Sequence, residues 1–91
     1  MLYLFSYDIE NDARRARMHK LLENHGQWVQ KSVFELILDD AQLQEILDRA
    51  EKLILGDFDS LRIYTLCGAC FERVRVLGCG PRPQDAEVFI V

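Results

Sequence analysis

Asp8 is the residue whose type and position point most directly to chemistry. It stands at the end of an apolar segment and just before a segment rich in helix-forming residues. The N-terminus of a helix carries free amide groups and a partial positive charge, so a phosphate group could dock beside this carboxylate. A carboxylate there could hold Mg²⁺ or Mn²⁺, which would polarise the phosphate and activate water for in-line attack. Metal-assisted hydrolysis of a phosphodiester bond is therefore the first hypothesis.

A cluster of basic residues follows Asp8 on the expected helix, namely Arg14, Arg15, Arg17 and Lys20. Arg14 and Arg15 fall within about one turn of the helix start, where they could contact a phosphate backbone. Because the formal net charge is -4, phosphate contacts must come from a clustered site of this kind. The alternative is that the arginines form ordinary ion pairs on a solvated helix, with Glu10, Asp12 and Glu23 as partners.

The metal hypothesis needs more than one copy of the chain. A single aspartate is a poor metal site, and an aspartate in front of a helix is commonly a cap or a solvated end. A two-fold axis between two copies would supply two Asp8 carboxylates. The metal site and a dimer therefore support each other as predictions.

Three cysteines form a second constellation. Cys67 and Cys70 have the spacing of half a zinc site or of a redox pair, with Cys79 available as a third ligand. His19 and His25 belong to the first helix, far along the sequence from the cysteines. Zinc binding and covalent catalysis therefore have weak support, and reduced cysteines in a loop or in the core are favoured.

Aromatic residues offer a further kind of contact. Tyr7, Trp28 and Phe34 could stack on bases, although aromatic residues in the strands of a small domain more often pack in its core. We favour the packing interpretation, and Phe34 is the least clear of the three.

The hydrophobic pattern predicts the elements that position these residues. Residues 1–9 are apolar on both faces, which predicts a central strand with Tyr3, Phe5 and Tyr7 on one face. A helix over 13–24 follows the candidate caps Asn11 and Asp12, and Gly26 is expected to end it. Residues 27–38 predict a tight hairpin with its turn at 30–32.

A second helix is predicted after a capping box formed by Asp39 and Gln42. Its apolar face comprises Leu43, Ile46, Leu47, Ala50, Leu53 and Ile54. A polar break at 56–60 and a half-buried strand over 61–66 complete the order βαββαβ. Two helices on one side of a four-stranded antiparallel sheet make an α+β, ferredoxin-like fold.

The segment 68–91 is left over as a tail. A short strand is predicted at 74–77 and an apolar terminal strand at 88–91. Because an apolar terminal strand needs cover, we expect it to pair with the sheet edge of a second copy. The 91 residues would then form one domain, 1–91, with 68–91 as a C-terminal dimerisation tail in a homodimer that exchanges these strands.

Composition limits the class of protein. Hydrophobic residues make up 49% and charged residues 29% of the chain, which is typical of a folded soluble domain. Apolar runs stay well short of the roughly 20 residues that cross a bilayer, and the N-terminus lacks the basic flank of a signal peptide. We expect no membrane association and a cytoplasmic location.

Several segments together resemble the CRISPR-associated protein 2 family, from one end of the chain to the other. They are residues 3–9, 11–15, 26–35, 59–64 and 88–91. The resemblance implies a ferredoxin-like homodimer whose last strand packs on the partner, with Asp8 as the metal-binding residue. By position, the family places Tyr7, Arg15, Arg17 and Phe34 near nucleic acid or the cleft.

The resemblance also implies two functions. Members are described as metal-dependent endonucleases on RNA or double-stranded DNA, which implies Mg²⁺ or Mn²⁺ as cofactor here, and as the bridge between two dimers of the CRISPR-associated integrase during spacer acquisition. The sequence departs from many members at Trp28, where they carry an arginine, and tryptophan cannot donate a charged hydrogen bond to phosphate. A regulatory or small-molecule domain ranks last, because no glycine-rich phosphate loop is present.

Overall fold

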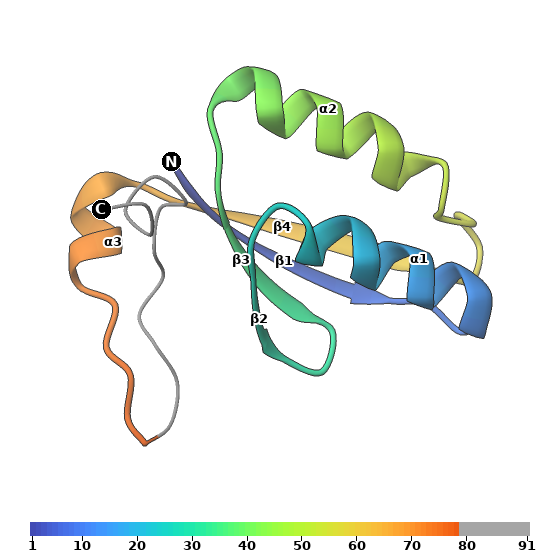
Figure 1. Ribbon diagram of the computed structural model, residues 1–91, viewed down its shortest axis with the longest axis horizontal. Helices are drawn as coiled ribbons and strands as arrows, with labels where there is room; N and C mark the ends of the chain where they lie inside the picture. The colour runs from blue at the N-terminus through green and yellow to red at the C-terminus, as the bar shows by residue number, and fades with distance from the viewer. Residues whose placement is uncertain (79–91) are drawn as a thin grey trace.

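The computed structural model describes residues 1–78, which form four strands and three helices (Figure 1). The strands are β1 (Leu2–Asp8), β2 (Gln27–Gln30), β3 (Val33–Ile37) and β4 (Ser60–Leu66). The helices are α1 (Asp12–Glu23), α2 (Asp40–Glu51) and α3 (Gly68–Glu72). The predicted order βαββαβ is confirmed, and α3 is an addition that the sequence pattern did not predict.

The four strands form one antiparallel sheet in the order β2-β3-β1-β4. The central position of β1 confirms the prediction drawn from its two apolar faces. In register, Phe5 lies opposite Phe34 on one side and Ile63 on the other. Asp8, the last residue of β1, lies opposite Ser60 at the start of β4.

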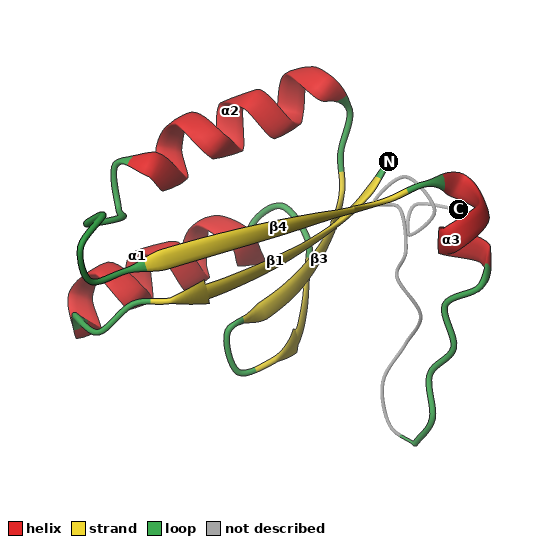
Figure 2. Cartoon of the chain, turned by 180° about the vertical axis from the view of Figure 1, so that it is seen from behind, coloured by secondary structure: helices red, strands yellow, loops and turns green. Residues whose placement is uncertain are grey.

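Both long helices cover the same face of this sheet, as Figures 1 and 2 show. Because side chains alternate along a strand, every second residue of β1 points into this layer. The resulting core consists of Tyr3, Phe5, Tyr7, Ile9, Met18, Leu22, Phe34, Leu36, Leu38, Ile46 and Ala50. The opposite face, which neither α1 nor α2 covers, is called the open face below; it carries Leu4, Ser6, Asp8, Arg62 and Tyr64.

The two long helices begin at the caps that the sequence predicts. The Asn11 side chain accepts a hydrogen bond from the Arg14 backbone N–H at 2.9 Å. Asp39 and Gln42 form the predicted capping box, each side chain accepting from the other residue's backbone N–H, at 2.7 and 2.9 Å. Among residues 1–78, no helix has the length and hydropathy needed to cross a membrane.

Gly26 has a role different from the one expected. Helix α1 ends at Glu23, with Asn24 as its cap, before the chain reaches Gly26. A Cβ atom at Gly26 would lie 2.5 Å from both the Glu35 carbonyl oxygen and the Leu36 side chain. Glycine is therefore required because the chain passes close to β3 here, rather than because it stops the helix.

The predicted hairpin turn is confirmed between β2 and β3. Lys31 adopts a positive φ of 41° in this turn, a conformation that residues other than glycine rarely adopt. Its carbonyl accepts a hydrogen bond from the Trp28 indole N–H at 2.9 Å. Trp28, although 54% exposed, thus stabilises the turn.

The tail differs from the prediction where the structure describes it. The short strand expected at 74–77 is absent from the single chain, where these residues are irregular and Leu77 is 94% exposed. Alternation of Val and Arg favours a strand, but a strand also needs a neighbour to pair with, and none lies beside it within residues 1–78. The predicted strand at 88–91 lies outside the described residues.

Candidate functional site

Asp8 is an exposed carboxylate at the end of a central strand. Its carboxylate forms no hydrogen bond or ion pair with any other residue of the described part of the chain. Strand alternation directs it to the open face, opposite to its buried neighbour Tyr7. Asp8 is thus free to bind a ligand from solvent or from another molecule.

Arg62 is a basic residue on the same open face, and sequence reasoning missed it. It lies opposite Ser6 in β4, two residues from the position that faces Asp8. Diagonal neighbours of this kind are roughly 7–8 Å apart, within reach of a long side chain. The alternation of residues 61–66 indicates that Arg62 lies on the polar face of its strand. Only the pairing register with β1 shows that this face also carries Asp8.

The donor chemistry at Asp8 fits Mg²⁺ or Mn²⁺ in part. Carboxylate oxygens are preferred ligands, and Mg²⁺ is often held by one or two carboxylates together with water and substrate phosphates. Within residues 1–78, no three His, Cys, Asp or Glu side chains come close enough together to hold a metal ion. In the described part of one chain, Asp8 is the carboxylate that the strand end directs to this face, and a second copy of the chain would add another.

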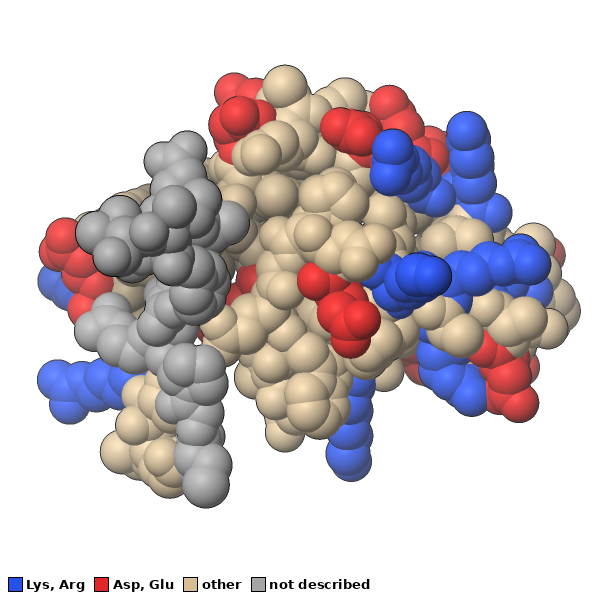
Figure 3. All heavy atoms as spheres, in the orientation of Figure 1, with Lys and Arg blue, Asp and Glu red and all other residues tan. Residues whose placement is uncertain are grey.

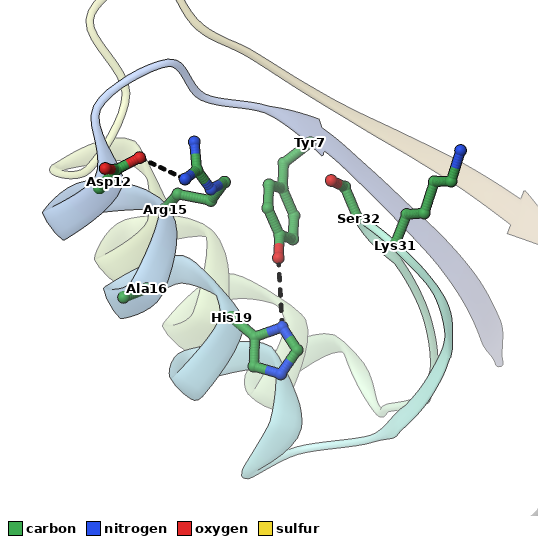
Figure 4. A pocket seen from close by; sticks show the side chains of 7 residues that line it. All are labelled: Tyr7, Asp12, Arg15, Ala16, His19, Lys31 and Ser32. Atoms are coloured by element: carbon green, nitrogen blue, oxygen red, sulfur yellow. Dashed lines mark hydrogen bonds and ion pairs between the residues drawn. The ribbon is translucent and has the colours of Figure 1, made fainter.

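A pocket of about 510 Å³ opens on the other side of β1, between α1 and the hairpin turn (Figure 4). Its lining residues are Tyr7, Asp12, Arg15, Ala16, His19, Lys31 and Ser32. The Tyr7 hydroxyl lies 3.3 Å from His19 Nδ1, and His19 Nε2 lies 3.3 Å from the Glu23 carboxylate. In Figure 4 the Lys31 amino group points away from Tyr7.

Tyr7 lines this pocket and packs against the buried ring of Phe34. Their rings stack with centroids 6.4 Å apart, and the His19 ring meets Phe34 edge-on at 5.0 Å. Burial raises the pKa of Tyr7, against a lowering effect of Arg15, so its hydroxyl is un-ionised at neutral pH. Phe34 is fully buried, which favours packing, and its contact with nucleic acid stays a prediction.

Arg15 is tied to the loop that follows Asp8. Its Nη1 donates to the carbonyl oxygens of Ile9 at 3.1 Å and Glu10 at 3.3 Å, and its Nη2 pairs with Asp12. The pairing with Asp12 is one of the ordinary ion pairs that the sequence suggested. The side chain remains 45% exposed, so one edge of the guanidinium still faces solvent at the pocket.

Arg14 has a structural partner that the sequence did not reveal. Its Nη2 lies 2.8 Å from Oδ2 of Asp59, a carboxylate with no exposed side-chain surface, which also accepts from the Leu55 N–H at 3.1 Å. Burial raises the pKa of Asp59, but the Leu55 N–H and Arg14 hold it below its ordinary value overall. The ion pair joins α1 to the loop before β4, and a direct contact of Arg14 with nucleic acid stays a prediction.

Arg17 is exposed and pairs with no other described residue. Figure 3 shows Lys and Arg side chains gathered over the α1 side of the molecule, with Asp and Glu among them. The fold divides the predicted basic cluster, since Arg14 and Arg15 have structural partners, and a phosphate-binding site on this surface stays a prediction. Of the three predicted arginines, Arg17 is the one with its guanidinium entirely unengaged.

His19, Lys31 and Ser32 are pocket residues that sequence reasoning missed. The sequence places His19 on the first helix, and in the structure it is half-buried against Phe34. Its spacing of four residues from Arg15 was an available signal, because such residues share one helix face. Lys31 and Ser32 are far from Tyr7 in the sequence. A backbone hydrogen bond from the Tyr7 N–H to the Ser32 carbonyl, 3.1 Å long, brings the hairpin turn beside the pocket.

Comparison with known proteins gives a consistent result. The family model for CRISPR associated protein Cas2 matches residues 1–74. A relative from Chloroflexus aurantiacus named CRISPR-associated endoribonuclease Cas2 1 is 41% identical over the whole of both chains.

Solved structures agree with this match. The crystal structure of Streptococcus pyogenes Cas2 at pH 6.5 superposes with a TM-score of 0.74 at 34% identity, covering 86% of this chain and 100% of that one. A chain of a partial Cas6-RT-Cas1–Cas2 complex superposes with a TM-score of 0.63 at 28% identity, covering 84% and 89%.

Proposed function

This chain belongs to the CRISPR-associated Cas2 family, and we propose that it is an endonuclease that hydrolyses phosphodiester bonds in RNA or DNA during spacer acquisition. The observation that carries the proposal is the free carboxylate of Asp8 on the open face of the sheet. The relative from Chloroflexus aurantiacus is named an endoribonuclease, which supports the same reaction here. We expect the protein to act in the cytoplasm.

Asp8 would hold Mg²⁺, or Mn²⁺ in its place. When bound, the ion supplies charge neutralisation at the phosphate and activation of water. Arg62 lies on the same face as Asp8 and would orient the scissile phosphate. Arg17 and the exposed edge of Arg15 would contact the backbone further along the strand, as positioning contacts that carry no base specificity.

A second copy of the chain would complete the site. The open face carries Leu4 and the half-exposed Tyr64 directly opposite each other, which is an apolar surface suited to association. A two-fold packing of two such faces would bring a second Asp8 to the first. The homodimer would thus place two Asp8 carboxylates at one site.

A bridging function is the second candidate. The structural match to a chain of a complex that contains both Cas1 and Cas2 supports a Cas1-type integrase as a partner of this protein. In that function the dimer would bind DNA through the basic surface of α1 and hold the integrase without cutting. This function needs dimer geometry and basic surface, but not Asp8.

Cleavage assays on the purified full chain test the nuclease proposal. Labelled RNA and duplex DNA are incubated with Mg²⁺, Mn²⁺ or EDTA and with wild type, Asp8→Asn or Asp57→Asn. Asp57 is an exposed acid in the loop before β4 and serves as the matched control. We expect Asp8→Asn to lose on the order of 100-fold or more in cutting rate, because the ion supplies several kcal/mol, and Asp57→Asn to cut like wild type.

Absence of metal-dependent cutting, or equal cutting by wild type and Asp8→Asn, would refute the nuclease. Binding of duplex DNA by Asp8→Asn then tests the bridging function separately. Retained DNA binding by Asp8→Asn supports the bridging function. Loss of DNA binding in a folded Asp8→Asn variant excludes a bridging function that is independent of Asp8.

A further inference from the structure

Cys67 and Cys70 lie at the junction between β4 and α3. Cys67 is the residue before the first residue of α3, and Cys70 follows three positions later, so both side chains lie on the same side of the first helical turn. Their Sγ atoms are 3.5 Å apart. Since a disulfide bond is about 2.05 Å long, a small side-chain movement would join them.

Both thiols are also accessible. Cys67 and Cys70 are free and exposed, so a reagent can reach either sulfur from solvent. Within residues 1–78, no group of three His, Cys, Asp or Glu side chains surrounds the pair in a way that could hold a metal ion. The short distance between the sulfurs and their exposure suit thiol–disulfide exchange.

The two thiols differ in acidity. The backbone N–H of Cys70, followed by the Cys70 thiol, lowers the pKa of Cys67, whereas the nearby Cys67 sulfur raises the pKa of Cys70. Cys67 directly precedes the first residue of α3, where the free N–H groups of a helix N-terminus favour a thiolate. Since the thiolate is the nucleophile, we expect Cys67 to attack and Cys70 to resolve the mixed disulfide.

We propose that Cys67 and Cys70 form a redox-active dithiol, which low-molecular-weight disulfides convert to an intramolecular disulfide. The site is separate from Asp8 and from the α1 pocket, and it does not depend on the nuclease proposal. Its consequence is local: a closed ring over residues 67–70 would fix the turn that joins the sheet to α3.

The reaction proceeds by two thiol–disulfide exchanges. The Cys67 thiolate attacks one sulfur of glutathione disulfide, which forms a mixed disulfide and releases one glutathione thiolate. Cys70 gives its proton to solvent and attacks the Cys67 sulfur, which breaks the mixed disulfide and releases the second glutathione thiolate. The two released thiolates take up protons, so the protein loses two hydrogens and two electrons while glutathione disulfide is reduced.

Full-length protein is equilibrated with defined ratios of reduced and oxidised glutathione, quenched with acid, alkylated and examined by intact mass and peptide mapping. We expect a species that lacks two hydrogens and carries a Cys67–Cys70 link, in wild type and equally in Cys79→Ser. The Cys70→Ser variant should stop at a glutathione adduct on Cys67. The Cys67→Ser variant should react more slowly than Cys70→Ser.

Three results would overturn the proposal: both thiols alkylatable at the most oxidising ratio, a link from either cysteine to Cys79, or a link between two chains. Equal rates for the two single variants would overturn the assigned roles of the two sulfurs. Circular dichroism of each variant verifies that the fold is retained, so that a lack of reaction cannot be attributed to unfolding.

Discussion

Three neighbouring arginines of α1 occupy three different environments. Arg14 pairs with the buried carboxylate of Asp59, and Arg15 binds loop carbonyls and Asp12. Arg17 is exposed and has no partner among residues 1–78. Successive residues of a helix point about 100° apart, so a basic cluster in the sequence is divided among several surfaces in the fold. Arg17 is therefore the best candidate for a phosphate contact, and Arg14 the best candidate for a stabilising role.

The variants Arg14→Ala and Arg17→Ala separate these two roles. Arg14→Ala would leave the Asp59 carboxylate buried without its cation, so the urea midpoint should fall clearly. Arg17→Ala should leave the midpoint unchanged, weaken nucleic-acid binding several-fold and reduce the salt dependence of binding by about one counterion. Urea denaturation and binding titrations at several salt concentrations measure both effects.

The reverse pattern would show that the assignment is wrong. If Arg14→Ala unfolds at the wild-type midpoint and loses affinity, then Arg14 leaves Asp59 to bind phosphate. Asp59→Asn is the companion variant, because it removes the buried charge while keeping the arginine.

At the scale of elements, the approach of the segment after α1 to β3 depends on one glycine. Gly26→Ala places a Cβ atom 2.5 Å from the Glu35 carbonyl oxygen, and backbone has to move to relieve the contact. We expect a loss of about 1–3 kcal/mol in the free energy of unfolding, as is typical of overpacking. Gly56→Ala is the control, since no heavy atom lies within 4 Å of the added Cβ.

Urea denaturation of the two variants measures the difference. Gly56→Ala should match wild type or gain slightly, because alanine reduces the freedom of the unfolded chain. Equal stability of the two variants would mean that β3 adjusts freely around Gly26, contrary to the structure.

Elements specified by local sequence were predictable, and those that depend on distant contacts were not. The capping box of Asp39 and the two apolar faces of β1 are local signals, and both predictions are confirmed. Helix α3 has no buried residue, so its sequence carries no periodic pattern that would reveal it.

In the candidate site, too, local features were predictable from the sequence and features that depend on distant contacts were not. The position of Asp8 at a strand end follows from local pattern alone. The pocket beside His19 requires α1 to lie against the hairpin turn, and the Arg14–Asp59 pair joins residues 45 positions apart. Neither could be derived without the tertiary fold.

At the scale of the whole molecule, α1 and α2 cover only one of the two faces of the sheet. In a chain of 91 residues a single core buries a modest fraction of the surface, so association through the open face would add stability. Tyr64 is 49% exposed on this open face, opposite Leu4. Asp8 lies on the same face, so the proposed association and the proposed catalysis would use one surface.

The variant Tyr64→Asp tests whether the open face joins two copies. A charge placed in the proposed interface should weaken the dimer roughly 30-fold or more, as expected for a residue at its centre. Phe58→Asp is the control, because Phe58 is 69% exposed beside Arg14, in the loop before β4. Sedimentation equilibrium should give twice the chain mass of 10.6 kDa for wild type and Phe58→Asp, and a concentration-dependent shift toward the single chain for Tyr64→Asp.

The same variant connects assembly to catalysis. If two Asp8 carboxylates share one ion, cutting by Tyr64→Asp should fall in proportion to the fraction of dimer and recover as the protein concentration rises. Cutting at full rate by a monomeric Tyr64→Asp would show that one chain holds the ion with a single Asp8. A wild type that sediments as one chain at all concentrations would exclude the homodimer, and with it the shared site.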